Sequence, residues 1–366
     1  MVQKSPNHLL ITTVVLVALG IIVIADASAP TALANFSDKY YFAKQQLVWA
    51  VAGLVIMVGT SIINYKFWNK LGVPILGFSI LLLFLVLIPS LGTSALGARR
   101  WLKLGPVSLQ PSEFLKLGIA FYFAKLAEDQ KEIVAYIVPL GIVIFLVMLQ
   151  PDLGSTLVVA SIGLSQIFIS GANLMHFFGI LITGVIGVIP LILFSDYRRQ
   201  RLMTFLESTS DPLGKSYHIR QILLALGSGG IFGVGIGQSR QKYLFLPEVA
   251  TDSVFAIIGE EVGFLGGFII IVLFMFFLYQ GFEVARRAPD SFSRVLATGI
   301  IVWIGSQAFL NIGSNVAVVP LTGIPLPFLS YGGSSLIMIL AAVGILMNIS
   351  KYKINEKKHR RFRRKI

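Results

Sequence analysis

The sequence has no cysteine and only four histidines in 366 residues. Without cysteine, the chain can form neither a disulfide framework nor a thiolate metal site. The histidines are scattered, with no pair at metal-ligand spacing, which argues against zinc or haem chemistry. Charged residues are also scarce, at 13%, whereas a soluble domain carries about a quarter. These absences argue against a soluble enzyme or a metalloprotein.

Apolar residues dominate instead: 55% of the chain is hydrophobic and the mean hydropathy is +0.82. A membrane-spanning helix needs about 20 apolar residues. Ten segments approach this requirement, the fourth being short enough for a half-helix: 8–27, 46–64, 71–89, 112–126, 133–150, 153–171, 174–194, 253–280, 295–314 and 332–350. We therefore predict an all-α polytopic membrane protein with about ten transmembrane helices in a single domain, 1–350. A large extracytoplasmic loop, about 195–252, would join helices seven and eight.

The net charge of +13 is concentrated at the C-terminus, where residues 351–366 hold nine Lys and Arg residues. A basic tail after a final span is typical of a cytoplasmic segment that faces anionic lipids. Nucleic acid is therefore not an expected partner. Ten spans then place both termini in the cytoplasm. The first span, 8–27, lacks a clear cleavage site and is expected to be retained.

The predicted outer face is unusually basic for a protein of this orientation. Its cations gather in two loops: Arg99, Arg100 and Lys103 in one, and Arg198, Arg199, Arg201, Lys215, Arg220, Arg240 and Lys242 in the other. Loop solubility explains any single one of them about as well as function does. As a set they indicate a site for an anionic group, and arginine suits phosphate through its two-pronged donor geometry.

Asp252 lies where this second loop enters the predicted eighth span. An ionisable group is costly at that position and needs a reason to be there. A carboxylate within reach of water and of a polar substrate can act as a general base. Glu248, four residues earlier, would share a helix face with it. Glu260 and Glu261 lie deeper, and we expect them to pair with buried cations.

Glycine-rich and turn-forming segments surround these charges. The run Gly227 to Gly237 can expose backbone N–H groups to phosphate, but a closely packed turn explains it better. In Gly97 to Lys116, Pro111 and Ser112 predict a helix start, and an internal ion pair with Glu113 explains Lys116. Gln150 to Gly154 reads as a tight hairpin with Asp152 as N-cap. Two prolines and a Gly-Gly pair make Gly323 to Ser335 irregular, as in a cavity wall.

Together these motifs resemble the SEDS family (shape, elongation, division, sporulation). The resemblance rests on six segments that span nearly the whole chain in the family's order: Gly97–Trp101, Gln110–Lys116, Gln150–Gly154, Gly227–Gly230, Leu246–Asp252 and Gly323–Ser335. The stretch Gly235–Lys242 is more similar to FtsW-type than to RodA-type members. Ala250 stands where many members have histidine, so a histidine is not essential there, and Lys215–Ser216 replaces a more usual glycine-containing turn.

The resemblance implies a peptidoglycan glycosyltransferase that polymerises lipid II at the outer face of the bacterial cytoplasmic membrane. It implies a class B penicillin-binding protein, a transpeptidase, as partner, together with other proteins of the division or elongation complex. Asp252 matches the family's catalytic aspartate. The substrate-binding candidates are Arg99, Arg100, Glu113, Lys116, Asp152, Arg240, Lys242 and Glu248. Mg²⁺ or Mn²⁺ would share the charge of the pyrophosphate, but no motif fixes a metal.

Two other functions compete with this one. A lipid II flippase needs a polar path across the whole membrane, and the inner half lacks a matching basic cluster. A scaffold that only recruits a transpeptidase leaves the clustered acids and bases unexplained. Clustering at one surface favours catalysis.

Overall fold

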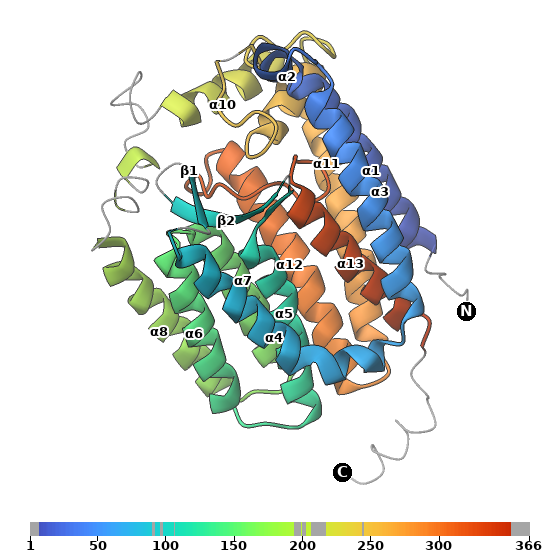
Figure 1. The fold of residues 1–366 in the computed structure, drawn as a ribbon, viewed down its shortest axis with the longest axis vertical. Helices are drawn as coiled ribbons and strands as arrows, with labels where there is room; N and C mark the ends of the chain where they lie inside the picture. Colours follow the sequence, from blue (N-terminus) through green and yellow to red (C-terminus); the bar gives the residue numbers. More distant parts are fainter. Residues whose placement is uncertain are drawn as a thin grey trace.

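The computed structural model describes residues 7–89, 92–95, 98–105, 107–193, 199, 203–205, 217–243 and 245–352. Long helices pack side by side, and a small sheet, α2 and α10 lie toward the upper end of the view (Figure 1). The helices are α1 Asn7–Ala27, α2 Ala29–Phe36, α3 Tyr41–Ile62, α4 Tyr65–Leu87, α5 Pro111–Glu128, α6 Val134–Leu149, α7 Leu153–Ile169, α8 Leu174–Leu193, α10 Tyr217–Gly229, α11 Val254–Arg286, α12 Ser291–Asn315 and α13 Gly333–Ser350.

Each of the ten predicted apolar segments is helical in the structure. Among the described residues, six helices are long and apolar enough to cross a membrane: α1, α3, α4, α11, α12 and α13. This agrees with a multi-pass membrane protein, while the number of ten crossings stays a prediction. Part of the predicted loop 195–252, including Arg198, Arg201 and Lys215, lies outside the described residues. Its apolar stretch 219–226 forms part of α10.

The helices differ in how deeply they are buried. In α12 and α13, 72% of the apolar stretch is buried inside the protein, against 28% in α4. The central helix α5 is buried along most of its length as well. Exposed apolar side chains on α1, α3, α4 and α11 suit contact with lipid. Several polar residues of α5 and α12, among them Glu113, Lys116, Gln307 and Asn311, therefore lie in the interior of the bundle.

A three-stranded antiparallel sheet lies between α4 and α5, so the all-α prediction was wrong for this segment. Strands β1 Gly92–Ala95, β2 Ala98–Leu104 and β3 Val107–Leu109 pair in that order. Leu102 is buried against Leu82 and Val86 of α4, which holds the sheet on the bundle. The strands have three to seven residues, too few for the two-residue alternation of a strand to stand out from a polar loop.

Helix α11 has a kink at Gly263, where the backbone takes a φ of 74°. The loop after α10 packs directly against this kink. Val234 and Gly235 donate backbone hydrogen bonds to the carbonyls of Glu260 and Glu261, and Phe264 donates to Gly230. A side chain at Gly233, which has a φ of 82°, would collide with the carbonyl of Glu261. The loop therefore supplies partners to the main chain where the helix is interrupted.

Candidate functional site

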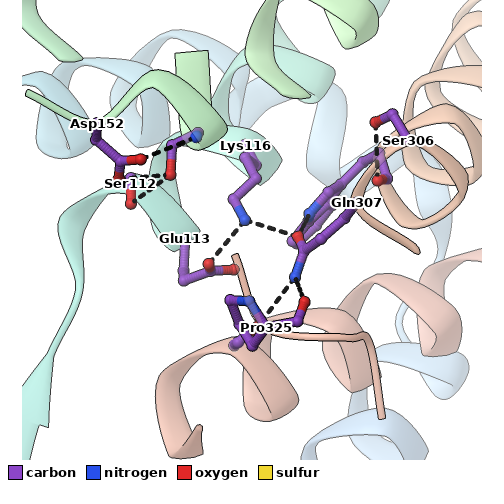
Figure 2. Close-up of polar contacts among 10 residues, drawn as sticks. Ser112, Glu113, Lys116, Asp152, Ser306, Gln307 and Pro325 are labelled. Atoms are coloured by element: carbon purple, nitrogen blue, oxygen red, sulfur yellow. Dashed lines mark hydrogen bonds and ion pairs between the residues drawn. The ribbon is translucent and has the colours of Figure 1, made fainter. Parts of the chain in front are cut away.

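A buried ion pair within α5 contacts α12 in the interior of the bundle (Figure 2). The Lys116 Nζ lies 2.7 Å from Glu113 Oε1 and 2.8 Å from Gln307 Oε1. Glu113 and Lys116 are essentially inaccessible to solvent. The lysine also lies over the ring of Trp303, 5.4 Å from its centroid. The sequence-based interpretation of Lys116 as half of an internal ion pair is confirmed.

Gln307 connects this pair to the irregular segment 323–335. Its Oε1 accepts from Lys116 and from Trp303 Nε1, and its Nε2 donates to the carbonyl of Pro325 at 3.0 Å. Segment 323–335 is mostly buried in the protein, which is the setting in which irregular backbone is tolerated at membrane depth. The ion pair therefore also positions the loop between α12 and α13.

Asp152 is the N-cap of α7, as predicted. Its carboxylate accepts from the backbone N–H of Ser155 at 3.0 Å and from the Ser155 hydroxyl at 2.7 Å. The carboxylate is buried. The Ser155 hydroxyl in turn lies within hydrogen-bonding distance of the Ser112 hydroxyl of α5, at 3.4 Å. In this structure Asp152 therefore holds the start of α7 against the start of α5.

Of the three cations in the first basic loop, Arg100 of β2 is bound within the fold. Its Nε donates to the carbonyl of Gln150 at 3.2 Å, and its Nη2 donates to the carbonyl of Pro151. Arg99 and Lys103, on the same strand, are exposed. Near the same sheet, Ser334 of α13 donates to the carbonyl of Ser108 at 3.1 Å. The structure thus brings together the motifs around residues 99–116, 150–154 and 323–335.

Asp252 lies just before α11 and is partly exposed. The expectation that Glu248 shares a helix face with Asp252 was wrong: α11 starts at Val254, and Glu248 has a φ of 50°. The backbone N–H groups of Thr251, Asp252 and Ser253 all donate to the Glu248 carbonyl, at 3.2 Å each. The chain therefore makes a compact turn, and Glu248 is an exposed member of it rather than a residue on the Asp252 helix face.

The turn at Asp252 is tied to α12 by two asparagines that the sequence-based reasoning missed. Asn311 and Asn315 donate to the Asp252 carbonyl at 3.0 and 2.9 Å. Asn311 also donates to the carbonyl of Ile324 at 2.8 Å. Trp303, Gln307, Asn311 and Asn315 recur every four residues in an apolar span, and that spacing was the signal in the sequence. We call these four residues the α12 polar stripe.

The stripe joins the Lys116 pair to the Asp252 turn. Gln307 contacts the pair, and Asn311 and Asn315 contact the turn. Eight residues of helix separate Gln307 from Asn315, a rise of about 12 Å. The Glu113–Lys116 pair and the backbone of the Asp252 turn are therefore both held by the same helix, α12, through its polar stripe.

Lys242 was expected to lie in an exposed basic loop, but in the structure it is buried. Its side chain is 3% exposed, and its Nζ lies 2.8 Å from both Asp26 Oδ1 of α1 and Glu261 Oε1 of α11. Burial disfavours the charged form, but hydrogen bonds and charge from Asp26 and Glu261 outweigh this and raise the pKa of Lys242. The expected pairing of Glu261 with a buried cation is confirmed.

The same expectation was wrong for Glu260, which forms no ion pair among the described residues and is bound by neutral donors instead. It accepts from the Ser239 hydroxyl and from the backbone N–H of Arg240, whose side chain is exposed. In the glycine run, the N–H groups of Gly233, Val234 and Gly235 donate hydrogen bonds to backbone carbonyls of the protein. The run forms a packed turn, which is the interpretation that the sequence favoured over phosphate binding. Within the described ranges, no group of three or more His, Asp and Glu side chains forms a metal site.

Comparisons with known proteins give the family to which this sequence and fold belong. Residues 7–355 match the family of FtsW, RodA and SpoVE, described as "Cell cycle protein". The chain belongs to the SEDS family. This SEDS protein is 43% identical over 359 residues to stage V sporulation protein E of Bacillus subtilis (strain 168), with 96% of this chain and 98% of the relative covered.

Other relatives and solved structures cover nearly the same length. A probable peptidoglycan glycosyltransferase FtsW of Geobacter metallireducens is 38% identical over 357 residues, 95% of each chain. A chain from the structure described as "Structural coordination of polymerization and crosslinking by a peptidoglycan synthase complex" gives a TM-score of 0.78 at 29% identity, covering 95% of this chain and 98% of that one. The structure of RodA of Thermus thermophilus gives a TM-score of 0.69 at 28% identity, covering 94% of this chain and 96% of that one.

Proposed function

We propose that this SEDS protein is a peptidoglycan glycosyltransferase that polymerises lipid II at the outer face of the cytoplasmic membrane. The observation that carries the proposal is the α12 polar stripe, which contacts the buried Glu113–Lys116 pair at Gln307 and the backbone of the Asp252 turn at Asn311 and Asn315. Buried polar and charged groups of this kind in a membrane protein are costly and mark functional sites by default. Relatives named as peptidoglycan glycosyltransferases supply the reaction class.

In the proposed reaction, Asp252 acts as the general base. Its carboxylate takes the proton of the 4-hydroxyl of the acceptor sugar, and the resulting oxygen nucleophile attacks the anomeric carbon of the donor. The bond from that carbon to the pyrophosphate oxygen breaks, and its electron pair leaves with undecaprenyl pyrophosphate. One glycosidic bond forms for each bond broken, and the proton stays on Asp252 until solvent removes it.

The leaving group needs positive charge, and the predicted cations differ in how they can supply it. Arg99 and Arg240 have exposed side chains and can contact a phosphate directly. Arg100 is engaged with two backbone carbonyls, while Lys116 and Lys242 are buried in ion pairs. We propose that the exposed arginines bind the pyrophosphate and that Glu113, Lys116, Asp152 and Lys242 shape the site from within. Glu248 would border the site.

The proposed partner is a class B penicillin-binding protein, which would crosslink the strands that this protein makes. A chain in a solved peptidoglycan synthase complex has the same fold, and that complex is described as coordinating polymerization and crosslinking. The proposed domain arrangement is one transmembrane domain, 1–350, with a basic cytoplasmic tail.

The activity is tested with purified protein in complex with a cognate transpeptidase whose own active site is inactivated. Glycan strands are assayed from lipid II, and lipid II scrambling is assayed in liposomes that contain the same complex. We expect polymerisation. Scrambling without any polymer would instead favour the flippase.

A further inference from the structure

The turn that carries Asp252 is held by its carbonyl oxygens. Three consecutive carbonyls accept hydrogen bonds from elsewhere in the fold: Ala250 from the Tyr331 N–H at 2.8 Å, Thr251 from the Ser330 hydroxyl, and Asp252 from Asn311 and Asn315. We call these four donors the carbonyl clamp. All of them come from α12 or from segment 323–335, which lie outside the loop that they hold.

The Asp252 carbonyl needs such donors because α11 does not use it. The first carbonyl to accept a bond within that helix is that of Ser253, from Ala256 and Ile257. A carbonyl one residue earlier is left without a helical partner, and when buried it must find another. Two side-chain amides donate to it here, at 3.0 and 2.9 Å.

The two amides are fully committed to backbone carbonyls. The Asn311 Nδ2 divides its two hydrogens between Asp252 and Ile324, and the Asn315 Nδ2 divides its own between Asp252 and Asn311. Both side chains are 1% exposed or less. Their Oδ1 atoms are buried and have no hydrogen-bond partner among the described residues. An unsatisfied buried acceptor is a cost to folding, so stability alone does not explain two asparagines here.

We infer that Asn311, Asn315 and Ser330 are positioning residues for the polymerisation reaction. They fix the backbone of residues 250–252 and thereby the direction in which the Asp252 carboxylate leaves the chain. This inference rests on the proposed function, because it assigns Asp252 the role of base. A misplacement of about 1 Å at a reacting group can cost about a hundredfold in rate. The clamp residues act on turnover through Asp252 and make no contact with the substrate.

The variant that separates positioning from folding is Asn315→Leu. It removes a donor to the Asp252 carbonyl and to the Asn311 carbonyl and, with them, an unsatisfied buried oxygen, while the branching and the number of side-chain heavy atoms are kept. In the purified transpeptidase complex we expect kcat for lipid II polymerisation to fall about tenfold or more. KM and the midpoint of thermal unfolding should stay close to wild type. A merely structural role would lower the unfolding midpoint and leave kcat per folded molecule unchanged.

Asn348→Leu is the matched control. Asn348 is also a buried asparagine, but it bonds Ser61 and Tyr65, away from the Asp252 turn. We expect it to lower the unfolding midpoint with kcat per folded molecule intact. Ser330→Ala, which removes the donor to the Thr251 carbonyl, should lower kcat as Asn315→Leu does. If Asn315→Leu does not fold, Ser330→Ala tests whether the clamp positions Asp252.

Asp252→Asn completes the set. If Asp252→Asn is inactive and Asn315→Leu keeps the wild-type kcat, the clamp proposal fails while the proposed role of Asp252 stands. If Asp252→Asn polymerises as fast as wild type, the proposed base is wrong and the clamp has nothing to position. A fall in kcat matched by an equal rise in KM would also contradict positioning, because it would indicate altered substrate binding.

Discussion

At the residue scale, the two buried lysines of the described part of the chain are both paired with carboxylates. Lys116 is in contact with Glu113 and Gln307, and Lys242 with Asp26 and Glu261. A buried ion pair adds little stability over an apolar pair of the same volume, but removing one partner leaves an uncompensated buried charge. These lysines therefore matter as members of networks, and their removal has different consequences from the removal of a surface cation.

Lys116→Met is expected to destabilise the protein by about 3–5 kcal/mol, because Glu113 is left buried without its cation. The double variant Glu113→Gln with Lys116→Met should recover much of this loss. Thermal unfolding in detergent measures both. Lys44→Met is the control, since Lys44 pairs with Asp38 at the surface, and it should change the midpoint little. Equal effects of Lys116→Met and Lys44→Met would contradict the buried network.

Sequence alone predicted the Glu113–Lys116 pair and the Asp152 cap, which the structure confirms, and it proposed Asp252 as the base, which stays a prediction. Each has a charge or a capping position that is unusual in an apolar chain. Gln307, Asn311 and Asn315 were missed because neutral amides are common in membrane helices and carry no such signal singly. Only the fold shows that they face Lys116 and Asp252. The environment of Lys242 was also missed, since its partner Asp26 lies 216 positions earlier in the chain.

At the scale of elements, the kink in α11 and the glycine-rich loop form one unit. The loop donates N–H groups to the carbonyls of Glu260 and Glu261, next to the interruption at Gly263. The sequence showed the glycines but not the surface they pack against, so it left phosphate binding and close packing both open. The three short strands were hidden for a related reason: their pairing partners are set by the hairpin and by contact with α4.

Gly233→Ala should disrupt this unit, because the added Cβ would collide with the backbone of α11 and the residue has a positive φ. We expect a lower unfolding midpoint and a loss of polymerisation activity. Gly227→Ala is the matched control: it lies on α10, and nothing is within 4 Å of the added Cβ. There we expect no loss of stability, since alanine favours helix over glycine by about 1 kcal/mol. Similar midpoints for the two variants would contradict the close approach.

At the scale of the whole molecule, the sequence predicted a multi-pass helical membrane protein, and every predicted apolar segment is a helix. Which helices are central was not predictable from hydropathy, because α4 and α12 are both apolar and differ in burial only through packing. Of the cations predicted for the outer face, Arg198, Arg201 and Lys215 lie outside the described residues. Orientation in the membrane follows from charge distribution alone and stays a prediction.

The absence of cysteine makes this orientation directly testable. Lys39 lies between α2 and α3 and Lys131 between α5 and α6, and both side chains are exposed. In intact spheroplasts, a membrane-impermeant maleimide should label Lys39→Cys readily and Lys131→Cys only after permeabilisation. The reverse pattern would place the Asp252 turn on the cytoplasmic side and remove the proposed reaction from the outer face.

The central claim is that Asp252 is the base of a lipid II polymerase, and the rate of glycan synthesis by Asp252→Asn tests it most directly. The variant is purified with the inactivated transpeptidase and compared with Asp38→Asn, which neutralises a partly exposed carboxylate in a loop. General base catalysis contributes about 10²–10⁴-fold. We predict that Asp252→Asn loses polymerisation by at least a hundredfold while Asp38→Asn matches wild type. Wild-type rates for a folded Asp252→Asn complex would contradict the account.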